Sequence, residues 1–158
     1  MKNTWMILTA ASVFVADQLS KLVVMQIMNL PLRGEIEILP PYINFRMAWN
    51  RGINFGLFAG EGEATRWILI AVAVAISAWV ALWIGRGRFG AAAQVSAGFL
   101  IGGAAGNVID RITYGAVADF LNMSCCGIDN PYAFNVADIG VFAGAFGLIL
   151  FANEKKPA

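Results

Sequence analysis

Residues 106–120 read GNVIDRITYGAVADF and mark the place where a long apolar run gives way to ionisable side chains. Residues 89–109 carry no charged side chain, and the quoted stretch then supplies Asp110, Arg111 and Asp119. Charged side chains are costly at membrane depth, and where they occur there they usually have a function. The stretch therefore predicts the end of a membrane-spanning helix with functional groups beside it.

The whole chain has the composition of an integral membrane protein. Of its 158 residues, 59% are hydrophobic and only 13% are charged, whereas about 25% charged residues are usual in soluble domains. The mean hydropathy is +0.67. A net charge of +1 argues against nucleic acid as a partner. No linker or internal repeat divides the chain, so residues 1–158 are interpreted as a single domain.

Four segments are long and apolar enough to cross a membrane, which takes ~20 mainly apolar residues per helix. We place them at about residues 5–28, 67–85, 89–112 and 132–152. The first contains Asp17 and Lys21, and the fourth contains Asp138. No small-residue cleavage site follows the first apolar run, so we expect a retained helix and not a signal peptide.

The charges flanking these segments predict the orientation. Both termini and the short 85–88 connector fall on one side, and they hold five cations in fewer than twenty residues. The long 29–66 connector holds four cations, diluted by glutamates. The positive-inside rule then places both termini in the cytoplasm. The cations on that side are Lys2, Arg86, Arg88, Lys155 and Lys156. At ~1.5 Å per residue, the polar residues of the helices converge on one level in the outer leaflet.

The 29–66 connector has the alternation of a β-sheet. In YINFRMAWN, residues 42–50, apolar and polar side chains alternate, and EIEIL at 35–39 does the same. The predicted fold class is an all-α membrane protein with four transmembrane helices and a small extracytoplasmic β-sheet between helices 1 and 2. The apolar face of that sheet either packs against the helix ends or offers a groove for an extended peptide. The sequence alone leaves both open.

Glycine repeats indicate which helices pack together. The third segment has Gly98, Gly102 and Gly106, and the fourth has Gly140 and Gly144. This small-xxx-small spacing lets helix backbones approach closely in a membrane. The two runs predict direct packing of the third helix on the fourth.

The residue types present narrow the chemistry. The chain has no histidine, which excludes Ser-His and Cys-His catalysis and the usual zinc sites. Cys125 and Cys126 are neighbours, and we interpret them as incidental. Asp17 and Lys21 are four residues apart on one helix and are expected to form an ion pair. The sequence predicts no metal site and no cofactor.

Two carboxylates remain as candidate catalytic groups. Asp119 follows the third helix, at the start of the outer loop, and Asp138 begins the fourth, so both arrive at one interface from opposite ends of a connector. Two carboxylates at a water-accessible membrane edge suggest aspartic-protease chemistry. The alternative is that each caps or anchors a helix end, and the spacing alone favours neither.

Five blocks of the chain resemble one family. DQLSK at 17–21, NRGINF at 50–55, GGAAGNVIDR at 102–111, VADF at 117–120 and FNVAD at 134–138 are similar to the signature blocks of lipoprotein signal peptidase, signal peptidase II, in order and spacing. The resemblance implies a multi-pass aspartic peptidase of the bacterial inner membrane, with its active site near the extracytoplasmic face. It implies cleavage of diacylated prolipoproteins directly before the lipidated cysteine.

The resemblance also assigns roles to residues. The catalytic pair maps onto Asp119 and Asp138, and structural polar support onto Asp17 and Lys21. Five residues map onto positions that bind or orient the substrate: Asn50, Gly52, Asn107, Arg111 and Asn135. Asn107 and Arg111 are one helical turn apart and share a face, whereas Asp110 points away and is expected to be a structural partner. Asn54 departs from the family pattern, which usually has a small Ala or Ser there.

Two other classes of function fit parts of the sequence. Intramembrane charges also mark ion paths, so a small transporter or channel is the alternative reading. Against it, the charges gather in one leaflet and no polar residues continue to the other side. A structural assembly protein would leave five polar blocks unexplained. We expect a monomer whose partners are diacylated prolipoproteins and membrane lipid.

Overall fold

The computed structural model describes residues 3–40, 42–52, 63–125, 127 and 130–153. Asn54 and Cys126, which the sequence singled out, lie outside these residues. So do the terminal lysines used in the orientation argument, Lys2, Lys155 and Lys156.

Three helices in the described part of the chain are long and apolar enough to cross a membrane. The first runs over Thr4–Ile27 and consists of α1 (Thr4–Leu22) followed by one π-helical turn, Val23–Ile27. The other two are α3 (Glu63–Arg86) and α4 (Ala91–Tyr114), each of 24 residues. The first three predicted spans are thus confirmed to within a few residues.

The fourth apolar helix is shorter than predicted. Helix α5 covers Val136–Phe151, 16 residues, and begins four residues after the predicted start at 132. Residues 132–135 are not helical: Phe134 pairs with Leu121, and Asn135 is the N-cap of the helix. In the described part of the chain, three helices and not four therefore have the length and composition of a membrane span. Still, α5 exposes large apolar side chains such as Phe142 (76%) and Ile149 (80%), which is unusual for a helix facing water.

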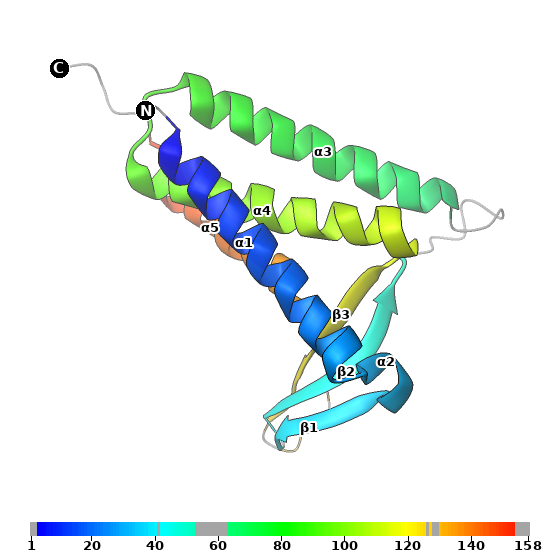
Figure 1. Cartoon of the computed structure of the whole chain (residues 1–158). Helices are drawn as coiled ribbons and strands as arrows, with labels where there is room; N and C mark the ends of the chain where they lie inside the picture. The colour runs from blue at the N-terminus through cyan, green and yellow to red at the C-terminus, as the bar shows by residue number, and fades with distance from the viewer. Residues whose placement is uncertain (1–2, 41, 53–62, 126, 128–129, 154–158) are drawn as a thin grey trace.

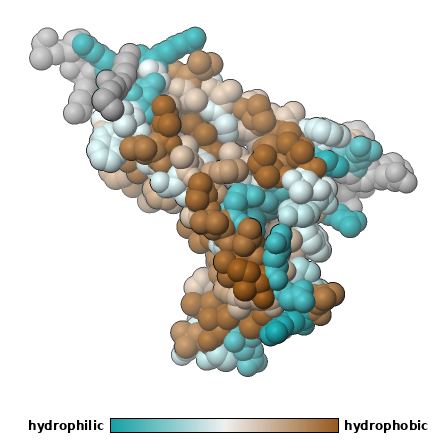
Figure 2. Space-filling view, viewed as in Figure 1, coloured by the Kyte–Doolittle hydropathy of each residue, from teal (hydrophilic) through white to brown (hydrophobic). Residues whose placement is uncertain are grey.

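Helix α4 is the central helix and contacts α1, α3 and α5. The beginning of α1, the end of α5 and the short connection between α3 and α4 lie at one end of the molecule, and the sheet lies at the other (Figure 1). Figure 2 shows hydrophobic side chains over much of the helices, and hydrophilic ones where helices and sheet meet and at the opposite end of the helices. This arrangement suits a bundle whose middle is surrounded by lipid.

Glycines allow both close contacts of α4, but on two different faces. Gly103 lies against the backbone of Ala137 in α5, and Gly144 of α5 lies against Leu100, so the predicted α4–α5 packing is confirmed. Gly98 and Gly102, however, face α1, where an added Cβ would meet the backbone of Met6 and of Ala10. Because adjacent helical residues point about 100° apart, Gly103 faces α5 while Gly102 faces α1. The prediction that the repeat Gly98, Gly102 and Gly106 packs on the fourth helix is therefore wrong for Gly98 and Gly102.

The sheet has three antiparallel strands in the order β1-β2-β3: β1 (Glu35–Leu39), β2 (Ile43–Asn50) and β3 (Val117–Met123). The first two strands were predicted. The third was not, and the expectation that Asp119 lies in a loop is wrong, because Asp119 is in β3 opposite Ala48. Residues 117–120 are all buried, so this strand lacks the apolar–polar alternation that identifies a half-buried strand.

The apolar face of the sheet is covered by the end of the first helix and by the short helix α2 (Leu30–Arg33). Phe120 packs with Val24 and Leu30, and its ring meets that of Phe45 edge-on at 5.6 Å. Ile36, Phe45 and Met47 pack against this cluster. Of the two readings of this face, packing against the helix ends is the one observed. This packing fixes β3, and with it Asp119, next to the C-terminal end of the first helix.

Candidate active site

The two candidate catalytic aspartates come from different elements and are joined by one asparagine. Asp119 lies in β3 and Asp138 in the first turn of α5. The side chain of Asn135 donates a hydrogen bond to Asp119 Oδ1 at 2.6 Å and accepts one from the backbone N–H of Asp138 at 2.8 Å. The backbone N–H of Asn135 donates to Asp138 Oδ2 at 3.4 Å, which completes a capping box. Asn135 is fully buried.

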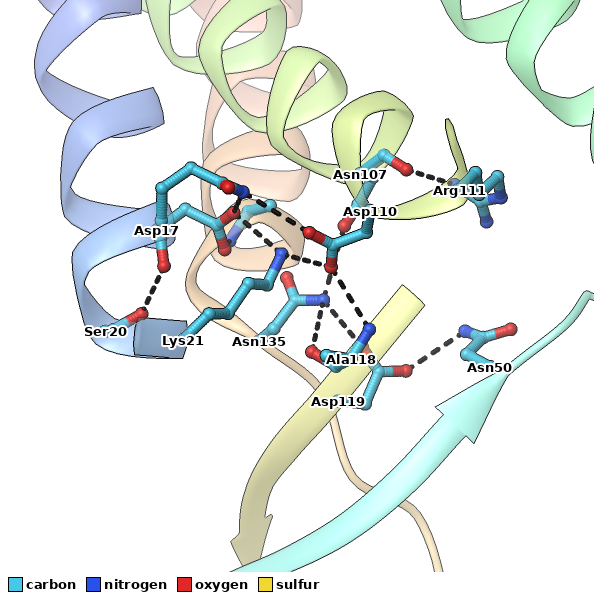
Figure 3. A network of polar contacts seen from close by, with 12 residues as sticks. Asp17, Ser20, Lys21, Asn50, Asn107, Asp110, Arg111, Ala118, Asp119 and Asn135 are labelled. Carbon is cyan, nitrogen blue, oxygen red and sulfur yellow. Dashed lines mark hydrogen bonds and ion pairs between the residues drawn. The ribbon is translucent and has the colours of Figure 1, made fainter. Parts of the chain in front are cut away.

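Each aspartate has a second amide partner. Asn107 of α4 donates to Asp138 Oδ1 at 2.8 Å, and Asn107 Oδ1 accepts from Asn135 at 3.3 Å. Asn50, at the end of β2, donates to Asp119 Oδ2 at 3.1 Å (Figure 3). A continuous chain of hydrogen bonds thus runs from β2 through β3 and α5 to α4.

Gly52 holds the Asn50 side chain in place. Its backbone N–H donates to Asn50 Oδ1 at 3.0 Å, so that the Asn50 amide group is turned towards Asp119. The φ of Gly52 is +88°, a value that side chains with a Cβ rarely adopt. This positive φ explains why residue 52 is a glycine.

The environment of Asp119 favours its protonated form. The residue is 2% exposed, and burial together with the neighbouring Asp138 raises the pKa of Asp119 to about 6. Hydrogen bonds from Asn50 and Asn135 and the charge of Lys21 act in the opposite direction. Burial penalises the charged form, and a second carboxylate adds repulsion. Asp119 therefore holds a proton at a pH where an ordinary aspartate is ionised.

Arg111 lies at the edge of this group. Its guanidinium donates to the backbone carbonyl of Asn107 at 3.2 Å, and its Nε has no partner among the described residues. Figure 3 shows it on the far side of Asn107 from Lys21. The structure thus places Arg111 beside Asn107, as predicted from their shared face.

A second polar group lies deeper, between α1 and α4. Lys21 Nζ is 2.7 Å from Asp17 Oδ2 and 2.7 Å from Asp110 Oδ2. The predicted ion pair of Asp17 with Lys21 is confirmed, and so is a structural partner for Asp110. Gln18, which the sequence did not single out, donates to both carboxylates at 3.1 and 3.3 Å. We refer to Asp17, Gln18, Lys21 and Asp110 as the lysine cluster.

No group of three or more His, Cys, Asp or Glu side chains in the described part of the chain is arranged to hold a metal ion. Cys125 is exposed, beyond the end of β3. Every other residue predicted for the site that the structure describes belongs to the hydrogen-bonded groups above. Two features of the site were not predicted from the sequence: the role of Gln18 as a donor to both carboxylates, and the strand that carries Asp119.

A family model and individual relatives of this chain point to the same family. Residues 9–153 match the family model described as signal peptidase (SPase) II. A lipoprotein signal peptidase of Methylobacterium sp. (strain 4-46) is 41% identical over 142 residues, covering 90% of this chain and 84% of the relative. One from Rhodopseudomonas palustris (strain CGA009) is 38% identical over 156 residues, covering 96% and 93%.

A solved structure has the same fold. It is described as a bacterial membrane enzyme structure obtained by the in meso method, and it superposes with a TM-score of 0.77 at 27% identity. The similarity covers 92% of this chain and 90% of that one. With the family model matching nearly the whole chain, this protein belongs to the signal peptidase II family.

Proposed function

We propose that this chain is a membrane aspartic endopeptidase that removes the signal peptide from diacylglyceryl-modified prolipoproteins by cleaving before the lipidated cysteine. The observation that carries the proposal is Asn135, which hydrogen-bonds to both Asp119 and Asp138. Family membership and the name of the relatives, lipoprotein signal peptidase, support the substrate class. The position of both aspartates where the helices meet the sheet suits a substrate that is half in lipid.

The two aspartates divide the work of activating water. Asp138 lies in the first turn of α5 and accepts a hydrogen bond from the Asn107 amide, and we assign it the role of general base. It takes a proton from water as the water oxygen bonds to the scissile carbonyl carbon. Asp119, whose pKa is raised to about 6 by burial and by Asp138, reacts in its protonated form and donates its proton to the carbonyl oxygen. The proton on Asp138 then passes to the amide nitrogen as the C–N bond breaks, and Asp119 takes back a proton from one hydroxyl of the tetrahedral intermediate as its C=O bond re-forms. This frees the amino group of the lipidated cysteine and returns both aspartates to their starting states.

The remaining residues hold the pair and the substrate. Asn50, Asn107 and Asn135 fix the carboxylates through the hydrogen bonds described above. The guanidinium of Arg111 suits peptide carbonyls of the substrate, because it is planar and presents several N–H groups in a fixed geometry. The reaction needs no cofactor and one copy of the chain.

The activity is tested with purified protein in detergent and a synthetic prolipoprotein peptide carrying diacylglycerol on its cysteine. We expect cleavage directly before that cysteine, with no loss of activity in the presence of a chelator. The same peptide without lipid is the control and should be cleaved far more slowly. No cleavage of the lipidated peptide would reject the proposal and return the transporter or channel reading.

The proposed orientation places both termini in the cytoplasm and the sheet on the extracytoplasmic side of the inner membrane. A variant that keeps Cys125 as its only cysteine should react with a membrane-impermeant thiol reagent on intact spheroplasts, since this residue is exposed on the sheet side. A cysteine placed at Gly87, in the connection between α3 and α4, should react only after the membrane is opened. The opposite labelling pattern would invert the topology.

The raised pKa of Asp119 predicts a pH dependence. If protonated Asp119 is required, kcat/KM should fall as the pH rises through about 6, because kcat/KM reports the free enzyme. The Asn50 hydrogen bond lowers this pKa, so Asn50→Ala should move the fall to higher pH. Asn44→Ala, on the same strand, should leave it in place. A fall that stays put or moves to lower pH in Asn50→Ala would contradict this assignment of the proton.

A further inference from the structure

The lysine cluster reaches the backbone beside Asp119. Asp110 Oδ2 accepts a hydrogen bond from the backbone N–H of Ala118 at 3.1 Å, and Ala118 directly precedes Asp119. Strand β3 pairs with β2 along one edge, and on its other edge Phe134 bonds to Phe120 and Leu121. Among the described residues, no strand lies beside Ala118 on that second edge. Asp110, 1% exposed, supplies the acceptor for the Ala118 N–H group.

The same cluster reaches the backbone beside Asp138. Asp17 Oδ1 accepts a hydrogen bond from the backbone N–H of Ala137 at 2.9 Å, and Ala137 directly precedes Asp138. The N–H groups in the first turn of a helix lack partners within that helix. Asp17 is fully buried and comes from 120 residues away in the sequence.

One lysine joins these two attachments. Lys21 Nζ is 2.7 Å from both carboxylates and is 4% exposed (Figure 3). Lys21 and Asp17 belong to α1, and Asp110 belongs to α4. The segments that carry the two candidate catalytic aspartates are therefore held by the same buried ammonium group, each through one carboxylate.

Building on the catalytic roles proposed above, we propose that the lysine cluster is a two-armed positioning device that sets the separation of the catalytic pair. Asp110 is the arm that places Asp119, Asp17 is the arm that places Asp138, and Lys21 fixes the arms to each other. None of the three side chains touches the reacting atoms. Besides the charge of Lys21, which lowers the pKa of Asp119, their effect on the reaction is geometric, and small displacements of catalytic groups have large effects on rate.

Each of the two carboxylates accepts hydrogen bonds from several donors. Replacing either with asparagine, which has nearly the same shape, therefore tests the hydrogen bonds with little change in packing. Asp110 accepts from Lys21, Gln18 and the backbone of Ala118. An amide has one acceptor oxygen in place of two, so Asp110→Asn cannot serve all three donors. In Asp17 the donors are divided differently, with Lys21 and Gln18 on Oδ2 and the backbone of Ala137 on Oδ1, so Asp17→Asn loses the acceptor for one of these two groups.

Kinetics on these two variants separate positioning from folding. We expect Asp110→Asn and Asp17→Asn each to lower kcat by up to about 100-fold, with KM changed less than about threefold. The control is Leu100→Ala, which removes a side chain from the apolar cluster that contains Leu148 and lowers Tm without touching the lysine cluster. Its kcat, measured well below its Tm, should match the wild type. If all three variants lose activity only in proportion to Tm, the positioning role is rejected.

A measurement on the wild-type enzyme covers the case in which the variants do not fold. With isotopically labelled alanine, the backbone amide signals of Ala118 and Ala137 should lie downfield, as expected for N–H groups bonded to carboxylates. Where the variants fold, Asp110→Asn should shift the Ala118 signal and Asp17→Asn the Ala137 signal. Wild-type signals at ordinary positions would overturn the proposal. An active Asp119→Asn would instead reject the catalytic pair, so the two failures are distinguishable.

Discussion

Asp119→Asn and Asp138→Asn are each expected to lower turnover by about 10⁴-fold and to leave a folded protein, since positioned acid–base groups contribute up to that factor. Asparagine keeps an acceptor oxygen for Asn135 or Asn107 but cannot exchange the proton that the mechanism requires. With no histidine in the chain, no other side chain of the usual kind can replace the pair. The measurement is single-turnover cleavage of a lipidated prolipoprotein peptide.

The matched control for these variants is Glu37→Gln, which neutralises an exposed carboxylate on β1 and should retain wild-type turnover. In cells, the two aspartate variants should accumulate prolipoprotein that carries diacylglycerol and still has its signal peptide. Substantial cleavage by either variant would rule out the proposed mechanism with two aspartates.

Asn135→Ser is expected to lower kcat by about 10²-fold or more with little change in Tm. Serine is as good an N-cap as asparagine, so it keeps the hydrogen bond from the backbone of Asp138. Its side chain is too short to donate to Asp119 as well, and Asp119 Oδ1 then loses its closest partner. Kinetics and thermal unfolding on the same preparation measure the two effects.

Asn135→Ala separates the two roles of this residue further. It removes both the cap and the bridge, so its kcat should match that of Asn135→Ser while its stability falls by an additional ~1 kcal/mol, the usual cost of a lost N-cap. If Asn135→Ser instead has wild-type kcat, Asn135 acts only as a helix cap, and its hydrogen bond to Asp119 does not contribute to catalysis.

Local features of the site were predictable from the sequence. The ion pair of Asp17 and Lys21 follows from their spacing on one helix, and the shared face of Asn107 and Arg111 follows from the helical turn. The start of α5 was missed by four residues, because the apolar letters of PYAF hide a non-helical segment that ends in the N-cap Asn135. Capping chemistry, and not hydropathy, sets that boundary.

Contacts between distant segments were not predictable in the same way. Residues 117–120 lack the alternation of apolar and polar side chains that predicts a strand, because successive residues there are all buried by other parts of the chain. Whether Gly102 or Gly103 faces α5 depends on the rotation of α4 against its neighbours, and one residue changes the direction by about 100°. The partner of Asp110 lies on another helix, so its identity depends on the same rotation.

The sequence by itself determined that this protein is a membrane protein with long apolar helices, a small sheet and a few costly buried charges, because hydropathy, helical spacing and strand alternation are properties of single segments. Only the tertiary structure decided that Asn135 joins the two aspartates and that Lys21 holds the backbone beside both. Those contacts bring together residues up to 120 positions apart. Their geometry is fixed by how α1, α4, β3 and α5 pack, and burial makes each hydrogen bond there obligatory, since an unpaired polar group has no water to turn to.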